Sequence, residues 1–192
     1  MSNSELLEEM QGCGSHHLKG SEAFTLRGND TDLTVFEFWR WYYSDLLDNK
    51  ARVAEYLVLK ALGFSGANDS RFWSPHNVIY KGSRIEIRTA AYMKSSNDDE
   101  PSDKHIRHID IRAKDCQAYL FCLLPGKSKE TANPLILDNW EFYIIPTWYL
   151  ELECGKNITI TMSKVRRLVK KANYEDLQTS VDIAIKQSNP II

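Results

Sequence analysis

Residues Phe72–Lys94, FWSPHNVIYKGSRIEIRTAAYMK, decide the fold that we predict for this chain. Two strand-like runs flank residues 81–83, and Gly82 supplies the backbone freedom that a tight turn between antiparallel strands needs. Successive side chains of a strand point to opposite faces of a sheet. Glu86 and Arg88 therefore share one face of the second strand, and the isoleucines beside them point to the other face.

Asn77 sits just before the first strand of this hairpin, on the surface that Glu86 and Arg88 share. Lys94 has the same strand parity as Glu86 if the second strand extends that far. A carboxylate, a carboxamide and a guanidinium that converge at the end of a hairpin indicate a site of chemistry or recognition.

Length and composition predict one compact α/β domain, because 192 residues with 43% hydrophobic content suffice for a core. The formal net charge of −2 gives no overall attraction to nucleic acid or anionic membranes. No apolar run approaches the roughly 18 residues of a transmembrane helix, and the N-terminus lacks a signal-peptide pattern. We expect a cytoplasmic protein without membrane contact.

Four cysteines stand at positions 13, 116, 122 and 154 without a CxxC pair. Cys116 and Cys122 fall in one strand-like run, about 20 Å apart if extended, so they do not bond to each other there. Free and mostly buried thiols are the natural prediction. Cys13, His16 and His17 suggest a metal site, but no fourth ligand or repeated spacing accompanies them.

Residues 1–31 are predicted to form a flexible polar tail, and residues 32–192 a single domain. Order begins near Thr34, where Thr34 and Glu37 fit a capping box ahead of the aromatic run FEFWRWYYSDLL. Phe36, Trp39, Tyr43 and Leu47 recur at helical spacing, which predicts an amphipathic helix with its aromatic face in the core. The alternative is that these rings form a base-stacking platform.

A second helix is predicted from Asp48 or Asn49 to Gly63. Glu55 falls inside the apolar arc of this helix, where an isolated charge is expensive and needs a partner. Two partners remain open. Arg52 stands three residues earlier and offers an intrahelical ion pair; alternatively, Glu55 leans over the hairpin and joins Glu86.

The remaining elements follow from apolar runs and turn residues. AYLFCLL is apolar throughout, as is typical of a central strand covered on both faces. Strands are predicted at 108–112, 117–124, 141–146 and 157–162, helices at 148–153 and 174–187, and a helix N-cap at Ser163.

Five cations stand within eight residues near the C-terminus, and such a cluster is able to follow a phosphate backbone. Solvated helix faces have the same appearance. The five are Lys164, Arg166, Arg167, Lys170 and Lys171.

The predicted helix with an inward Glu55, followed by a hairpin with Glu86 and Arg88 on its second strand, resembles the PD-(D/E)XK nuclease superfamily. The pattern of that superfamily has an acidic residue on the first strand of the hairpin and E-x-K on the second. The similarity extends from about residue 35 onward, through VAEYLVLKALG, RFWSPHNVIY, IEIRTAAYMK, AYLFCLL, NPLILDNWEFYIIPT and ITITMSKVRRL. It implies a restriction-endonuclease-like mixed β-sheet flanked by α-helices, with the active site at the hairpin. The match resembles a poorly characterised branch of that superfamily.

By this resemblance Glu55 matches the helix glutamate and Glu86 the metal-binding carboxylate. Asn77 replaces the aspartate, Arg88 replaces the lysine, and Lys94 falls where related sequences carry glutamine. Asparagine offers Mg²⁺ a carbonyl oxygen but no charge. Arginine is larger than lysine and suits a bidentate pair with Glu86, which fills the space of the metal.

Two hypotheses follow. In the first, a degenerate active site has lost or weakened the nuclease activity, and the fold binds DNA, RNA or a protein without needing a cofactor. In the second, the chain is an active Mg²⁺-dependent DNA endonuclease, with Asn77 and Glu86 on the metal, Glu55 assisting, and Arg88 or Lys94 stabilising the phosphate. Either form is compatible with a monomer or a homodimer.

Overall fold

The computed structural model divides the chain into two compact units, Met1–Ser44 and Asp45–Ile192. The residues that the structure describes are 19–64, 73–74, 77–93, 101–102, 106, 108–112, 115–128, 130–155 and 157–188. Among these residues no helix is long and apolar enough to span a lipid bilayer.

The first unit contains a hairpin that begins within the expected tail of residues 1–31, followed by the helix that we expected after Thr34. Strands β1 (Ala23–Leu26) and β2 (Asn29–Thr34) pair antiparallel and are followed by α2 (Val35–Tyr42). Arg27 and Gly28 both have positive φ, which is the geometry of a two-residue hairpin turn, and this signal escaped the sequence prediction. Residues 1–18, with Cys13, His16 and His17, lie outside the described residues.

The capping box at the start of α2 is confirmed. The Thr34 hydroxyl accepts a hydrogen bond from the Glu37 backbone amide at 3.3 Å, and the Glu37 carboxylate accepts one from the Thr34 amide at 2.9 Å. The predicted burial is confirmed for Leu47, which lies beyond the end of α2 and is buried in the core of the second unit, and it is wrong for the aromatic residues of the face. Phe36 and Tyr43 are exposed, while Trp39 is half-buried against Gly20. Within the described residues 19–44, Val35 is the one hydrophobic side chain that is buried, so this segment offers no core to enclose the aromatic rings.

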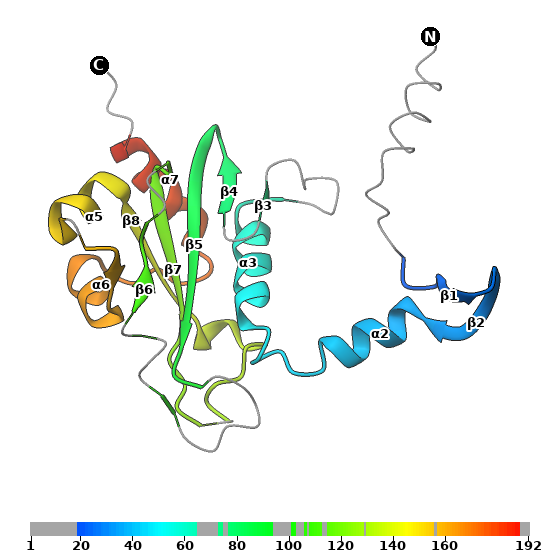
Figure 1. Ribbon diagram of the computed structural model, residues 1–192. Helices are drawn as coiled ribbons and strands as arrows, with labels where there is room; N and C mark the ends of the chain where they lie inside the picture. The colour runs from blue at the N-terminus through cyan, green and yellow to red at the C-terminus, as the bar shows by residue number, and fades with distance from the viewer. Residues whose placement is uncertain are drawn as a thin grey trace, which may run out of the picture. The chain divides into compact units, whose positions relative to one another are not determined.

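The second unit is built around a five-stranded mixed sheet in the order β3-β4-β5-β7-β8 (Figure 1). Only the β5–β7 pair is parallel. The strands are β3 (Trp73–Ser74), β4 (Asn77–Tyr80), β5 (Ser83–Ala91), β7 (Ala118–Leu124) and β8 (Glu141–Pro146). The predicted hairpin is confirmed: β4 and β5 are joined at Lys81 and Gly82, which both have positive φ.

Helices cover both faces of this sheet, which confirms the α/β prediction (Figure 1). One face packs against α3 (Lys50–Ala61) and α7 (Leu177–Ser188). The other packs against α5 (Thr147–Cys154), α6 (Met162–Leu168) and the two-stranded sheet of β6 (Ile109–Asp110) and β9 (Thr159–Ile160). A short 3-10 turn, η2 (Leu137–Asn139), precedes β8.

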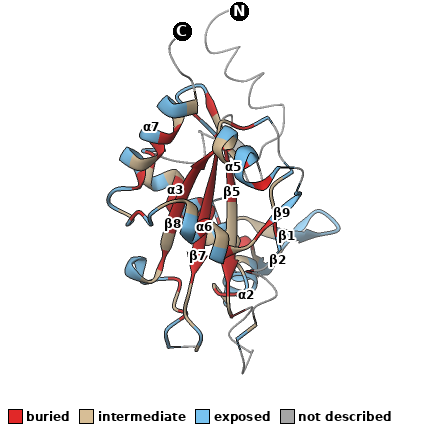
Figure 2. Cartoon of the chain, turned by 90° about the vertical axis from the view of Figure 1, so that its left-hand side faces the viewer, coloured by how far each residue is buried: buried red, intermediate tan, exposed pale blue. Residues whose placement is uncertain are grey.

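Strand β7 is the centre of the core, and every one of its residues is buried (Figure 2). Its even-numbered residues pack toward α3 and α7, and its odd-numbered residues pack toward α5 and α6. The continuous apolar run in the sequence is explained by this two-sided burial. Ser163 is not the N-cap of α6: Thr161 holds that position, and its hydroxyl accepts from the Lys164 amide at 3.1 Å.

Candidate functional site

Asn77, Glu86 and Tyr119 form one row across three neighbouring strands. Asn77 on β4 is the cross-strand partner of Glu86 on β5, and Glu86 in turn pairs with Tyr119 on β7. Directly paired residues point to the same face of a sheet. Because the Tyr119 ring belongs to the core cluster beneath α5 and α6, the row lies on that face. The hairpin therefore brings Asn77, Glu86 and Arg88 to one face, as the sequence predicted.

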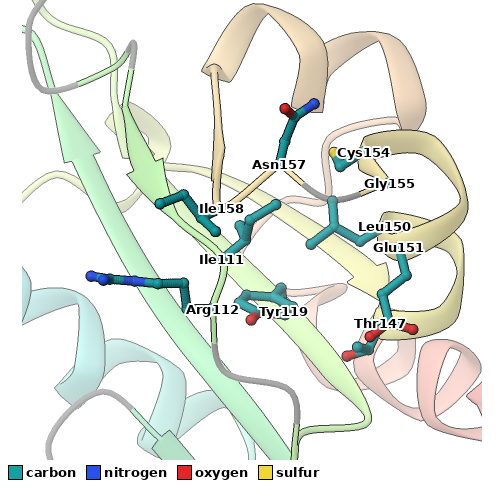
Figure 3. Close-up of a pocket in the computed structure, with 10 residues that line it drawn as sticks. All are labelled: Ile111, Arg112, Tyr119, Thr147, Leu150, Glu151, Cys154, Gly155, Asn157 and Ile158. Carbon is teal, nitrogen blue, oxygen red and sulfur yellow. The ribbon is translucent and has the colours of Figure 1, made fainter.

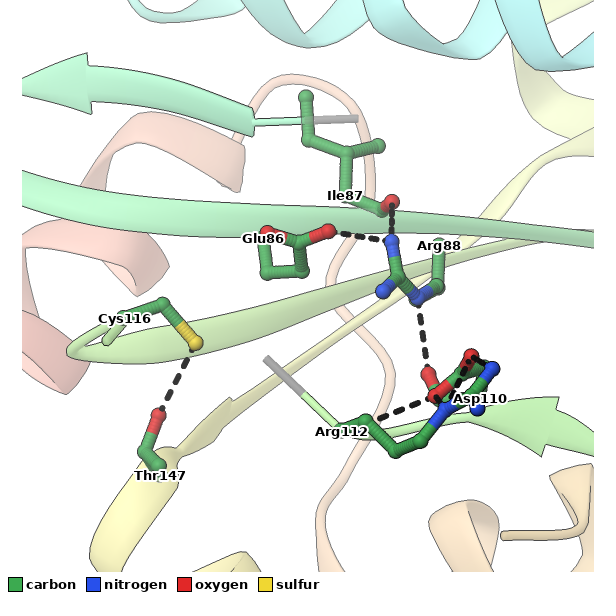
Figure 4. A network of polar contacts seen from close by, with 7 residues as sticks. All are labelled: Glu86, Ile87, Arg88, Asp110, Arg112, Cys116 and Thr147. Atoms are coloured by element: carbon green, nitrogen blue, oxygen red, sulfur yellow. Dashed lines mark hydrogen bonds and ion pairs between the residues drawn. The ribbon is translucent and has the colours of Figure 1, made fainter. Parts of the chain in front are cut away.

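Arg88 ties Glu86 to the segment around β6 (Figure 4). Its Nη1 forms an ion pair with the Glu86 carboxylate and also donates to the Ile87 carbonyl at 3.3 Å. Its Nε donates to the Asp110 backbone carbonyl at 2.8 Å. The pairing with Glu86 uses a single guanidinium nitrogen and is not the bidentate contact that we expected, and Nε is directed at the Asp110 carbonyl instead.

Glu55 does not join this row, and the hypothesis that it leans over the hairpin to reach Glu86 is wrong. It is buried on α3, which packs on the opposite face of the sheet, against Ile85 and Ile87. Its carboxylate accepts a hydrogen bond from the Arg52 guanidinium at 2.8 Å, which is the intrahelical ion pair that the sequence offered as the alternative. A site common to Glu55 and Glu86 is excluded by the intervening sheet.

Asp110 carries the second carboxylate beside the guanidinium of Arg88. The Arg112 Nε donates to both Asp110 carboxylate oxygens, at 3.0 and 2.9 Å (Figure 4). Hydrogen bonds from Arg112 lower the pKa of Asp110 from 3.8 to about 2, with smaller contributions from the charges of Arg112 and Arg88. Asp110 therefore stays ionised far below neutral pH.

This depressed pKa predicts an acid-sensitive contribution to stability. Asp110 stabilises the fold above pH 3.8, and the contribution disappears as the pH falls toward 2, because the unfolded chain then binds a proton first. The carboxylate is partly exposed, so we expect less than ~1 kcal/mol. Asp110→Asn should reduce the loss of unfolding free energy between pH 5 and pH 2, measured by urea titration at each pH. If Asp110→Asn left the pH dependence of the unfolding free energy unchanged, this assignment would be contradicted.

A hollow of about 430 Å³ adjoins the network and shares Arg112 and Thr147 with it (Figures 3 and 4). Tyr119 lies at its floor, and Glu151 and Asn157 contribute polar groups to its wall. Burial raises the pKa of the Tyr119 hydroxyl and of the nearby Cys116 thiol, whose sulfur lies 3.5 Å from the Thr147 hydroxyl. Both groups are therefore protonated at neutral pH, which makes Cys116 a poor nucleophile.

The three described cysteines, at positions 116, 122 and 154, are free and buried, as the sequence predicted. Lys94 lies outside the described residues. Among the residues that the structure does describe, no group of three or more His, Cys, Asp or Glu side chains is placed to hold a metal ion.

Two of the five clustered cations are engaged in the fold. Arg166 on α6 donates to the Glu141 carboxylate at 2.7 Å and to the Tyr143 hydroxyl at 3.2 Å, so it fastens α6 to β8. Lys164 donates to the Glu153 carbonyl at the end of α5. Arg167, Lys170 and Lys171 are exposed and form no ion pair with another described residue.

Lys170 and Lys171 also line a second hollow, of about 420 Å³, which includes Thr179 and Ser180 of α7. Sequence reasoning missed this hollow, and it missed Asp110, Arg112 and Tyr119 at the first site. The alternation in IDIR carries a signal for the Asp110–Arg112 pair, because residues two apart share a strand face. Tyr119 is hidden in an apolar run, and only the strand register reveals its neighbour Glu86.

The chain was compared with models of protein families, with curated proteins and with solved structures, and no match was found in any of the three.

Proposed function

We propose that the second unit is a PD-(D/E)XK-like domain in which an internal ion pair replaces the metal centre, and that it binds DNA without cleaving it. The support for the relationship is the motif at the hairpin together with a mixed sheet in which β5 and β7 are parallel. The proposed loss of catalysis rests on one observation, which is the ion pair between Arg88 and Glu86.

The donor atoms at the hairpin do not fit a divalent cation. Asn77 has no charge, and the buried Glu86 carboxylate is already neutralised by Arg88. Glu55 lies behind the sheet, paired with Arg52. Mg²⁺ binds chiefly through carboxylates in near-octahedral geometry, and one paired carboxylate with one carboxamide is a weak donor set. We therefore assign the Glu86–Arg88 pair to holding β5 against β6.

The test is cleavage of supercoiled plasmid in Mg²⁺ and in Mn²⁺, with metal binding followed by calorimetry. The parent and Glu86→Ala should both leave the plasmid intact, and the parent should release no binding heat with Mg²⁺. The double variant Asn77→Asp/Arg88→Lys, which restores the superfamily residues, should bind Mg²⁺ more tightly than the parent. Cleavage by the parent that Glu86→Ala abolishes would instead make the protein an active nuclease.

The proposed DNA contact consists of Arg167, Lys170 and Lys171, which are the exposed members of the basic cluster without an ion pair in the described structure. Three phosphate contacts predict a slope of about −3 in a plot of log K against log salt for duplex DNA. Lys170→Ala/Lys171→Ala should reduce the magnitude of that slope by about 2. Fluorescence anisotropy with a labelled duplex at several salt concentrations measures it.

The matched control is Lys127→Ala, which removes an exposed lysine outside the cluster and should leave the slope unchanged. Arg166→Ala is unsuitable for this purpose, because that side chain holds α6 to β8. An unaltered slope in the double variant would remove this surface from the interface.

A further inference from the structure

Arg84 is the residue of the β4–β5 hairpin whose charged group has no partner. Its guanidinium forms no hydrogen bond and no ion pair with another described residue. Its Nε is buried, and within the described part of the chain it is the single buried side-chain nitrogen or oxygen without a hydrogen-bond partner. A buried donor on a partly desolvated charge is costly unless an acceptor meets it. An acceptor from outside the chain would remove that cost.

The carboxylates on the same face of the sheet are already engaged. Arg84, Glu86 and Arg88 point to one face, because residues two apart in a strand share a face. Glu86 is paired with Arg88, and Asp110 is paired with Arg112. Two carboxylates therefore meet three guanidinium groups, and Arg84 carries the unbalanced positive charge. The missing counter-charge is that of an anion.

Gln117 places Arg84 at one corner of the sheet, where β5, β7 and α5 all begin. The backbone amide of Arg84 donates to the Gln117 side-chain carbonyl at 2.7 Å, and the Gln117 backbone amide donates to the Arg84 carbonyl at 2.8 Å. The amide of Thr147, the first residue of α5, donates to the Gln117 carbonyl at 3.0 Å. One residue thus joins the start of β5 to the first turn of α5.

Hydroxyl and amide donors lie at the same corner. The Thr147 hydroxyl is 3.5 Å from the Cys116 sulfur (Figure 4). Burial raises the pKa of the Cys116 thiol, and the positive charge of Arg84 acts in the opposite direction, so the guanidinium lies near that thiol. Helix α5 has no side-chain N-cap, and the amides of Trp148 and Tyr149 have no acceptor among the described residues. The positive end of the helix dipole adds to the attraction for an anion.

The corner is open to a ligand. Arg84 and Thr147 are half-buried, and Ile79, which pairs with Arg84 across the hairpin, is 42% exposed. Only the Nε of Arg84 is both buried and unpartnered, so the two terminal nitrogens of its fork remain accessible. That planar fork matches two oxygens of a phosphate or a carboxylate. A phosphate keeps further oxygens for the hydroxyl and amide donors, so it fits this set better than a carboxylate.

We propose that Arg84, together with the Thr147 hydroxyl and the first turn of α5, binds a phosphoryl group. A small phosphate ester and the backbone of DNA both present this group, and the chemistry of recognition is the same for both. The site shares no residue with the DNA contact proposed for Arg167, Lys170 and Lys171, and it does not depend on that contact.

Two-dimensional ¹H–¹⁵N NMR of the full chain tests the proposal, with sodium phosphate titrated against sodium chloride at equal ionic strength. In the parent the amide signals of Gln117, Trp148 and Tyr149 should shift and saturate with a Kd of roughly 1 mM. Arg84→Gln should weaken this binding about tenfold or more. Arg40→Gln, which removes an exposed arginine of the first unit, should titrate as the parent does. A parent without saturable shifts, or an Arg84→Gln variant that titrates like the parent, would overturn the proposal.

Two further measurements separate a forked phosphate contact from a bare positive charge. Arg84→Lys keeps the charge without the fork and should bind phosphate several-fold more weakly than the parent. Phosphate should raise the Tm of the parent and leave that of Arg84→Gln unchanged, because a ligand stabilises only the form that binds it. Equal affinity of Arg84→Lys and the parent, or acetate binding as tight as phosphate binding, would contradict the assignment.

The salt dependence of binding to a labelled DNA duplex identifies the source of the phosphoryl group. If the group belongs to DNA, Arg84→Gln should reduce the magnitude of the slope of log K against log salt by about 1. If it belongs to a small ester, that slope should stay unchanged while the binding of free phosphate is lost. The DNA contact of the basic cluster is tested by Lys170→Ala/Lys171→Ala, so the failure of one proposal leaves the other standing.

Discussion

Phe121→Ala should lower the free energy of unfolding of the second unit by about 4 kcal/mol, because truncation of a large buried aromatic side chain leaves a cavity. Phe121 is fully buried in the middle of β7, which pairs with β5 on one side and β8 on the other. Its ring stacks on Tyr119 with centroids 5.9 Å apart. The neighbouring strands β5 and β8 are held to β7 by backbone hydrogen bonds, so they have little freedom to collapse into the cavity.

Equilibrium unfolding in urea, followed by tryptophan fluorescence, measures this loss. Single domains of this size are stable by about 5–15 kcal/mol, so the variant retains only part of that margin. With a urea dependence near 2 kcal/mol per molar, the midpoint should fall by about 2 M. Trp148→Ala, on the exposed side of α5, is the control and should change stability by less than about 0.5 kcal/mol. A shift below about 1 kcal/mol for Phe121→Ala would contradict the central position of β7.

The strands of the second unit could be predicted because their sequence patterns are local. The β4–β5 hairpin follows from the alternation in RIEIR and from Gly82, which adopts the positive φ that the turn needs. Strand β8 occupies residues 141–146, the range that the apolar run indicated. The capping box likewise depends on residues three apart, so the start of α2 could be read directly.

The composition of the site could not be predicted to the same degree, because it depends on which face of the sheet each helix covers. The apolar arc of α3 shows that Glu55 points toward the sheet. It does not show which of the two faces of the sheet α3 covers. Strand parity groups Glu86 with Arg88, yet it carries no information on Asp110, which is 22 residues from Arg88 along the chain. Packing and register, rather than periodicity, separate Glu55 from the hairpin.

The aromatic run in α2 shows a further limit of periodicity. Helical spacing of apolar residues indicates that a face needs cover, and it does not specify what covers it. In most helices that cover is the core of the same domain. In the described residues 19–44 around α2, Val35 alone among the hydrophobic side chains is buried, and Phe36 and Tyr43 stay exposed. The clustered cations are a similar case, since only a structure separates Arg166, bound to Glu141, from Arg167.

Arg88→Ala should lower the free energy of unfolding by about 3 kcal/mol, because it leaves the buried Glu86 carboxylate without its counter-charge. It also removes the hydrogen bond to the Asp110 carbonyl, which links β5 to β6. Arg88→Lys keeps the charge but reaches fewer of these acceptors, so a loss of about 1 kcal/mol is expected. Urea unfolding of each variant at pH 7 provides the measurement.

A double-mutant cycle separates the ion pair from the packing of the two side chains. The cycle consists of Glu86→Leu, Arg88→Met and the double variant Glu86→Leu/Arg88→Met. The double variant removes both charges and should recover most of the stability that Arg88→Met alone loses, because no unpaired charge remains. The coupling energy of the cycle should then be about 2 kcal/mol or more. If Arg88→Ala costs less than about 1 kcal/mol, Glu86 does not depend on Arg88. In that case the carboxylate is available to another cation, and the hairpin regains the chemistry of a metal site.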